Sequence, residues 1–496
     1  MLCNKYKIKE VICLQSILMS LNVMLPVFLM IMLGVFLQHI GLMPRTMIRD
    51  LNRLCFNCFL PVMLFNNVRA TDFRQYFEWH LISYAVGSVL LLFVFLLTGI
   101  SSVSPVYDFP EQERFSGESI YNPYHSLDSL RSQGVPVDWK RANFHTHTKV
   151  DGIFNECSHS PQAVYDSLAA FGYDIVTFSN HNELTVHPFD SSLQVNVYEH
   201  GLNLLKYHKL VFGSDKVLHF DNIIPAILSQ RQFMMELLSK ESDFIQLNHP
   251  LRTPLSSEKI MKHLSGYQIM ELDSGISTEQ QYWDWALSSG HYSTALANDD
   301  LHYPDRSGCI AVRCNFLFCP SGRYEDIRDC LMQGCNYSMR VPDYGAGNWA
   351  VKHSGNSSLP YVEDIGLRDS STVFIVLSEQ ADSIRFSGEN HATLAMVEGS
   401  CRAEYTMSTD DSYVRITAYF PGGEVIYSNP FARYHAELKG VQPRHFTDAF
   451  EQKRPTVNIA LSALWNLSVL LVCSLLTFAL IGCLGAIAKL WRKTDK

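Results

Sequence analysis

The chain has 496 residues and a formal net charge of −9, from 40 basic and 49 acidic side chains. This length is enough for two or three domains. The acidic balance, without any run of basic residues, excludes nucleic acid as the expected main partner. Long uncharged stretches lie near both ends of the chain, and they indicate a membrane protein.

The first hundred residues contain apolar segments of membrane-spanning length. Residues 11–37 carry no charge and exceed the roughly 20 apolar residues that cross a bilayer. Three lysines within residues 1–10 leave a cleaved signal peptide as the alternative. Residues 81–100 are also long enough and uncharged, whereas residues 54–68 are short and interrupted by a proline, so they remain ambiguous. We expect transmembrane helices within residues 1–100.

The C-terminal end has the pattern of a last membrane helix. Residues 457–488 are uncharged, and a basic cluster follows, formed by Lys489, Arg492, Lys493 and Lys496. Such a cluster is typical of a cytoplasmic tail. We therefore expect a transmembrane helix over 457–490, with the segment 101–456 on the non-cytoplasmic side of a membrane, a bacterial inner membrane being the expected one.

Residues 101–139, rich in Ser, Pro, Tyr and Asp, are expected to form an irregular lead-in. Short apolar runs then alternate with helical patterns. The expected helix at 160–172 has Ser160 as its cap and Pro161 in its first turn. The expected strands are residues 174–180, 243–248, 267–272 and 292–298. This alternation predicts an α/β fold with a mostly parallel sheet that closes into a barrel over 140–345.

The pattern changes after the expected barrel. Apolar and polar residues alternate at short spacing in four segments, which are residues 371–378, 381–388, 413–420 and 424–429. Turn residues separate these segments. They predict a small antiparallel β-sandwich over residues 355–440.

The cysteines do not define a redox compartment. Cys55 and Cys58 have the spacing of a zinc ribbon, but they lie inside an apolar run. A later cluster either forms disulfides in an oxidising compartment or consists of buried thiols, and its members are Cys309, Cys314, Cys319, Cys330 and Cys335.

Histidine is concentrated in the expected barrel, which holds twelve of the nineteen, all between residues 145 and 302. Any one of them alone would be interpreted as a hydrogen-bonded structural residue. Several lie beside carboxylates at the polar ends of strands, and these ends meet at one mouth in a parallel barrel. Together they predict a site for two or three Zn, Mn or Fe ions. The set is His145, His147, His181, Glu199, His208, His249, Asp300 and His302.

Five segments resemble the ordered motifs of the PHP (polymerase and histidinol phosphatase) family: HTHTKVDG (145–152), FSNHN (178–182), YEHG (198–201), LNHP (247–250) and NDDLH (298–302). The resemblance implies a distorted (β/α)₇ barrel over 140–345 that holds two or three metal ions and hydrolyses phosphoesters. It implies the eight ligands above and, in addition, Asp151. The sequence departs from the family pattern at Asp151, which is one residue closer to the first histidines than usual, and at Asn180, where the family has an aspartate. His219 competes with His208 for one position.

The implied mechanism is attack on phosphorus by a hydroxide that the metal ions generate near neutral pH. Glu199 would bridge two metal ions, and Asp300 or a histidine would protonate the leaving group. Arg252 and Lys149 are candidate phosphate clamps, with solvated surface charges as the alternative interpretation.

Residues 22–97 resemble the opening helices of auxin efflux carrier type transporters. The matching features are the helix that contains Gly34, the Gly-Leu turn after it, and FLPVMLF at 59–65. Only the first helices of that fold are present, so we expect them to act as an anchor.

The sequence thus predicts a membrane-anchored, metal-dependent phosphoesterase that acts on a phosphorylated small molecule. The alternative is a non-catalytic metal-binding sensor or a component of a membrane transport complex. Sugar phosphates, nucleotides, phospholipid headgroups and histidinol phosphate are all compatible with the motifs, and the oligomeric state stays open.

Overall fold

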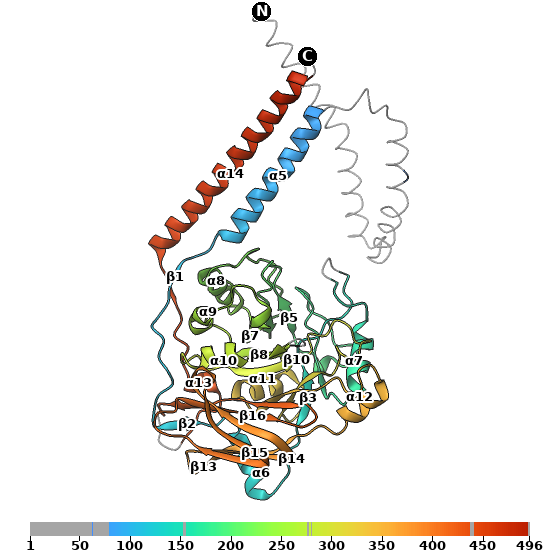
Figure 1. Cartoon of the computed structure of the whole chain (residues 1–496), viewed down its shortest axis with the longest axis vertical. Helices are drawn as coiled ribbons and strands as arrows, with labels where there is room; N and C mark the ends of the chain where they lie inside the picture. Colours follow the sequence, from blue (N-terminus) through green and yellow to red (C-terminus); the bar gives the residue numbers. More distant parts are fainter. Residues whose placement is uncertain are drawn as a thin grey trace, which may run out of the picture. The chain divides into compact units, whose positions relative to one another are not determined.

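A computed structural model of the chain describes Val62 and residues 79–151, 155–274, 277–278, 280–436 and 441–494 (Figure 1). The chain divides into two compact units, residues 1–86 and 87–496, and the second contains nearly all of the described residues. The spans expected at 11–37 and, apart from Val62, at 54–68 lie outside the described residues.

The first sheet has six strands in the order β10-β8-β7-β6-β5, with β9 paired to β8. Strands β7, β8 and β10 pair in parallel, whereas β6 is antiparallel to both β5 and β7. All the residues of β5 to β8 and β10 are buried, including the polar residues of β5, β8 and β10. The bounds are Val197–His200 (β5), Lys209–Phe212 (β6), Phe244–Leu247 (β7), Ile269–Ser274 (β8), Ser277–Thr278 (β9) and Thr294–Asn298 (β10).

The second sheet has eleven strands. Its main path is β13-β14-β16-β17-β12-β11-β3-β4, with β15 paired to β14 and with β18 paired to β16 and β2. The bounds are Ser119–Tyr121 (β2), Lys140–Asn143 (β3), Ile175–Val176 (β4), Arg313–Leu317 (β11), Asn336–Arg340 (β12), Val362–Arg368 (β13), Thr372–Ser387 (β14), Thr393–Thr406 (β15), Tyr413–Tyr419 (β16), Val425–Ser428 (β17) and Phe431–Tyr434 (β18).

Two isolated parallel bridges connect these sheets, one between His181 and Glu199 and the other between Thr146 and Leu301. Strand β4 contains only Ile175 and Val176, so no longer ladder forms between β4 and β5. The fold is therefore a mixed α/β arrangement of two sheets, and the prediction of a closed, mostly parallel barrel is corrected. Both bridges nevertheless bring strand ends from the two sheets together.

The β-rich segment at 355–440 is not a separate sandwich in the described structure. Its strand β17 pairs with β12, with Arg340 opposite Val425 and Tyr337 opposite Ser428, so the sheet continues from one region into the other. The two strands expected at 371–378 and 381–388 form a single strand, β14. An irregular register against β15, between Val376 and Ala381, lets this strand continue through the polar residues that suggested a turn.

The helix expected at 160–172 is α7, and it begins where its local signals predict. The Ser160 side chain accepts a hydrogen bond from the backbone N–H of Ala163 at the start of α7, and Pro161 occupies the first turn. The bounds are Asp128–Gln133 (α6), Pro161–Ala169 (α7), Leu228–Leu238 (α8), Glu258–His263 (α9), Gln280–Leu287 (α10), Tyr324–Gln333 (α11), Trp349–Asn356 (α12) and Phe446–Ala449 (α13), with short 3₁₀ turns at His125–Leu127, Ser191–Leu193, Pro250–Arg252 and Glu389–His391.

One continuous hydrophobic core joins the two sheets and their helices. The lead-in at 101–139 contributes to it, because Tyr121 and Tyr124 are fully buried and donate hydrogen bonds to backbone carbonyls of Gln333 and Asn336. The late cysteine cluster also lies here. None of its five members forms a disulfide and four are buried, so the buried-thiol interpretation holds.

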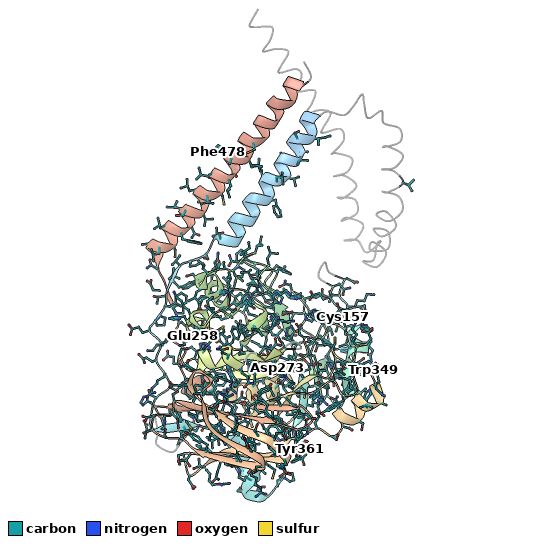
Figure 2. All side chains as sticks on the ribbon, in the orientation of Figure 1. Cys157, Glu258, Asp273, Trp349, Tyr361 and Phe478 are labelled. Atoms are coloured by element: carbon teal, nitrogen blue, oxygen red, sulfur yellow. The ribbon has the colours of Figure 1, made fainter. Side chains whose placement is uncertain are left out.

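The segments that flank this core pair with each other. Strand β1 (Tyr107–Asp108), which follows α5 (Trp79–Ser102) in the chain, is antiparallel to β19 (Thr456–Val457), which precedes α14 (Ile459–Thr494). The indole N–H of Trp465 donates to the carbonyl of Ser102 at 2.7 Å. Within the described residues, Ile459–Leu480 is the one helical segment that is long and apolar enough to cross a membrane by length and composition, with a mean hydropathy of 2.2. Figure 2 shows the side chain of Phe478 projecting from this helix.

Candidate metal centre

Glu199, the third residue of β5, lies at the centre of the histidine cluster and is 1% exposed. Its two carboxylate oxygens are surrounded by imidazole nitrogens. The nitrogen–oxygen distances are 3.2 Å for His145 Nε2, 3.3 Å for His147 Nε2, 3.1 Å for His181 Nε2, 3.1 Å for His208 Nδ1 and 3.5 Å for His249 Nε2.

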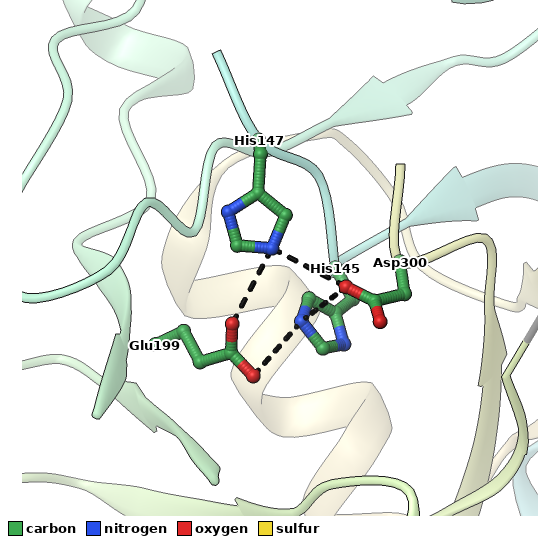
Figure 3. A group of neighbouring side chains, drawn as sticks. All are labelled: His145, His147, Glu199 and Asp300. Carbon is green, nitrogen blue, oxygen red and sulfur yellow. Dashed lines mark ion pairs between the residues drawn. The ribbon is translucent and has the colours of Figure 1, made fainter. Parts of the chain in front are cut away.

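A second carboxylate faces the same histidines from the other side (Figure 3). Oδ1 of Asp300 lies 3.1 Å from Nε2 of His145 and 3.3 Å from Nε2 of His147. Its other oxygen, Oδ2, forms an ion pair with the guanidinium of Arg252. Two carboxylates and two imidazoles thus converge on one small volume, which is a donor set that suits a divalent transition metal.

Two further groups of potential ligands adjoin the first. One consists of His181, Glu199 and His208. The other consists of His147, His181 and Glu156, with Oε2 of Glu156 3.0 Å from Nε2 of His181. Glu199 belongs to two of the three groups. Its Oε1 faces the imidazoles of His145, His208 and His249, and its Oε2 faces those of His147 and His181. This arrangement could hold up to three ions that share ligands.

The extended backbone after β3 places the first two histidines. Successive side chains on an extended segment point to opposite faces, so His145 and His147 share one face. The bridge between Thr146 and Leu301 brings them beside Asp300. Both His249 (φ 25°) and Asp300 (φ 50°) have left-handed backbones, which non-glycine residues seldom adopt. Such strain is typical of positions where the surrounding structure holds a functional side chain in place.

His208 reaches the site for a different reason. It precedes β6, and because β6 is antiparallel to β5 and β7, its starting end lies beside the ends of those strands. Gly201 makes room for it. A Cβ atom on Gly201, which has φ of +148°, would lie 2.4 Å from Cδ2 of His208, so only glycine permits this approach.

An outer layer of buried polar groups orients the inner one. Glu271 accepts a hydrogen bond from Nδ1 of His145 at 2.9 Å and another from the backbone N–H of His249 at 2.9 Å. The amide of Asn248 donates to Oε1 of Glu199 at 2.9 Å. With Nδ1 of His145 bonded to Glu271, its Nε2 is the nitrogen that faces Glu199 and Asp300.

The electrostatics favour ionised carboxylates. Burial by itself would raise the pKa of Glu199, but the imidazoles of His181 and His145 hold it well below its usual value. Burial is likewise outweighed at Asp300, whose pKa is lowered well below its usual value by His145, His147 and Arg252. Burial lowers the pKa of His208 to about 4, so this imidazole is neutral and has a lone pair to offer to a cation at neutral pH.

The arrangement of the donor atoms suits metal coordination better than it suits hydrogen bonds between these side chains. Nε2 of His145 and Nε2 of His147 are buried without a hydrogen-bond partner, although carboxylate oxygens lie 3.1 to 3.3 Å away. Buried polar atoms are rarely left in this state, because each unmade hydrogen bond costs free energy. Nitrogens and oxygens that converge without hydrogen-bond geometry are the expected arrangement of ligands around shared cations.

Of the nine ligands suggested by the sequence, eight come together here: Glu199, Asp300 and six histidines, each of which lies within ion-pair distance of Glu199, Asp300 or Glu156. Asp151 is exposed and lies outside the three groups, whereas Glu156, five residues later, lies within one of them. His302 is close to both Glu156 (3.3 Å) and Asp300 (3.6 Å).

Sequence reasoning missed Glu156 and Glu271. The spacing of Glu156 from the first histidines fits no motif, whereas Glu271 interrupts the apolar residues of β8 and could have been noticed as a charge inside a buried strand.

The remaining candidates separate clearly. Arg252 forms an ion pair with Asp300, whereas Lys149 is exposed to solvent. His219 is exposed, so His208 holds the contested position. Asn180 accepts a hydrogen bond from the backbone N–H of Thr148 at 2.7 Å and donates to Thr148 Oγ1 at 2.7 Å. These two hydrogen bonds hold the segment 145–152 in place beside Asn180.

Comparisons with known proteins give one family match near the N-terminus and one distant structural likeness. Residues 19–114 match the family model of membrane transport proteins. No curated protein matches the chain. Among solved structures, a two-domain protein from Bacteroides vulgatus that contains a predicted PHP-like metal-dependent phosphoesterase is similar, with 13% identity and a TM-score of 0.33 over 65% of this chain and 100% of that one.

Proposed function

We propose that the chain is a membrane-anchored, metal-dependent phosphoesterase. The observation that carries this proposal is the buried Glu199 carboxylate, which five imidazoles approach within 3.5 Å, with a second ionised carboxylate beside it. Divalent ions bound to such a set supply Lewis acidity and water activated for attack at neutral pH. Zn, Mn and Fe all suit imidazole and carboxylate donors.

The chain's own residues have distinct tasks in this proposal. Glu199 spans two groups of ligands and so fixes their separation. Asp300 is a ligand that also forms an ion pair with Arg252, and an ionised, paired carboxylate is a poor proton donor, so a histidine is the better candidate for protonating the leaving group.

In this proposal Arg252 binds the phosphoryl oxygens through its planar guanidinium. In the overall reaction a water oxygen forms a bond to phosphorus, the ester P–O bond breaks, and the leaving alkoxide takes up a proton.

Phosphate release tests the proposal. The full chain in detergent, loaded with Zn, Mn or Fe, is expected to hydrolyse para-nitrophenyl phosphate, and a chelator is expected to stop the reaction. His147→Asn should reduce turnover by at least roughly a hundredfold, because removing one inner ligand displaces the ions from their working geometry. His435→Asn is the matched control, since this side chain is 75% exposed and its partners, Glu118 and Ser116, belong to none of the ligand groups. A metal-loaded, folded chain without hydrolysis would contradict the proposal.

A second candidate function is a metal-binding component of a membrane transport complex. The match of residues 19–114 to membrane transport proteins favours it. It predicts that the metal binds and the protein remains folded, while none of the phosphate esters tested is hydrolysed. The same assay therefore distinguishes the two functions.

A further inference from the structure

Three loops beside the metal centre are joined into one rim, which we define as residues 201–206, 218–227 and 250–256. The first connects β5 to His208, and the third begins directly after His249. The backbone N–H of Leu204 donates to the carbonyl of Ile223 at 2.8 Å. The hydroxyl of Thr253 donates to the carbonyl of Lys206 at 2.8 Å.

A buried arginine fixes two of these loops to each other. Arg231, on α8, is 1% exposed and donates from Nε to the carbonyl of Pro225 at 3.0 Å. It also donates to the hydroxyl of Ser256 at 2.9 Å and to the carbonyl of Pro254 at 2.7 Å. Because a buried guanidinium needs its partners, the rim is held as a defined surface.

Each loop of the rim presents large apolar side chains to the outside. The exposed fractions are 68% for Leu204, 40% for Phe220, 46% for Leu251 and 60% for Leu255. Leu255 has φ of +64°, a conformation that costs a non-glycine residue free energy, and yet its side chain is not buried. Exposed apolar side chains on one connected surface indicate that this surface contacts an apolar environment outside the protein.

Hydrogen bonds connect this rim to the start of the apolar helix α14. The side chain of Asn222 donates to the carbonyl of Val103 at 3.2 Å. The carbonyl of Ser104 accepts a hydrogen bond from the side chain of Asn466, on α14, at 3.3 Å. The backbone N–H of Val106 donates to the hydroxyl of Ser462, also on α14, at 2.8 Å. The segment Ile459–Leu480 is the described helix that can cross a membrane, so a bilayer around it begins next to the rim.

We propose that the rim contacts the bilayer surface and that the hydrolysed ester is the phosphate headgroup of a membrane lipid. This inference rests on the proposed function. Leu251 is the neighbour of Arg252, so a lipid held at the rim would present its phosphate next to the guanidinium that pairs with Asp300. A water oxygen bonds to phosphorus, the P–O bond to the lipid breaks, the lipid alkoxide gains a proton, and phosphate departs into water.

The bilayer contact is tested without relying on activity. Leu255→Trp, in the full chain reconstituted into phosphatidylcholine vesicles, adds tryptophan emission that brominated phosphatidylcholine is expected to quench. Met396→Trp is the matched control, because Met396 is 54% exposed on β15 and does not belong to the rim. Equal quenching of the emission added by the two variants would overturn the bilayer contact.

The lipid substrate is tested by comparing two phosphate monoesters. The chain is reconstituted into phosphatidylcholine vesicles doped with phosphatidic acid, and its turnover of this lipid is divided by its turnover of para-nitrophenyl phosphate. Leu204→Gln combined with Leu255→Gln should lower this ratio at least roughly tenfold, since withdrawing a leucine side chain from an apolar phase costs about that factor in binding. Met396→Gln should leave the ratio unchanged.

An unchanged ratio in the double variant would overturn the lipid substrate. If the unsubstituted chain hydrolysed neither ester, the proposed function would fail, and the quenching measurement would still decide whether the rim meets the bilayer.

Discussion

Nδ1 of His145 donates a hydrogen bond of 2.9 Å to Glu271, and both side chains are fully buried. Glu271 also accepts from the backbone N–H of His249 and from the amide of Asn298. One carboxylate outside the ligand groups thus orients residues at or just beyond the ends of three strands, β3, β7 and β10. Its charge also makes the opposite nitrogen of His145 a better ligand.

Replacement of this carboxylate should weaken metal binding. In Glu271→Gln, an NH₂ group replaces one carboxylate oxygen and cannot accept hydrogen bonds from the N–H donors around it. His145 also loses its anionic partner. We expect the metal dissociation constant to rise roughly 10- to 100-fold, as found for partners of metal-bound histidines. Isothermal titration calorimetry measures this constant. Glu404→Gln, at a side chain 65% exposed, is the control, and equal affinities in both variants would contradict the assigned role.

Substitutions of Glu156 and Asp151 should have opposite effects on the ligand group formed by His147, His181 and Glu156. Glu156 contacts His181 and His302, whereas Asp151 lies outside the groups. Glu156→Gln should therefore lower the metal content of the purified chain by one ion, and Asp151→Asn should leave it unchanged. Elemental analysis after gel filtration gives the content. The opposite pattern would restore Asp151 as the ligand that the motif resemblance implied.

A buried ion pair holds α10 against the β-rich region. Arg415 donates to both carboxylate oxygens of Asp284, and neither side chain is exposed. Arg415→Met leaves Asp284 as a buried charge without its main partner, so we expect a loss of about 3–5 kcal/mol in the free energy of unfolding. Arg368→Met breaks an exposed pair with Glu404 and should cost about 1 kcal/mol or less. Urea denaturation compares the two, and similar losses would contradict the difference in burial.

Stability should also decline in acid through His291. Burial lowers the pKa of His291 to about 4, whereas the same group in the unfolded chain titrates near 6.5. Between these values the unfolded chain binds more protons, so this group's contribution is fully present above pH 6.5 and is lost as the pH falls toward 4. His291→Gln should remove that part of the pH dependence, by up to roughly 1.4 kcal/mol per pH unit.

Thermal midpoints at several pH values test this expectation. His435→Gln serves as the control, because its side chain is largely exposed. Protonation of the metal ligands affects all of these proteins alike and cancels in the differences. Parallel curves for the His291 variant and the unsubstituted chain would refute the assignment.

The candidate site was predictable from the sequence where its signals are local. The extended spacing of His145 and His147 places both on one face, and the polar residues after each apolar run mark where strands end. The cap at Ser160 is equally local, and the structure has it. Glu156 had no such signal, because the path of the chain between His147 and α7 decides which carboxylate turns inward.

Local patterns in the sequence identify the residue types that end the strands, and thereby eight side chains of the candidate metal centre, Glu199 among them. Only the tertiary structure decided how those strands pair: β6 runs antiparallel, β4 is too short to close a barrel, and β17 joins the β-rich region to β12. The physical reason is that alternation of apolar residues specifies which face of a strand is buried, whereas its neighbours and their direction depend on contacts between residues far apart in the chain.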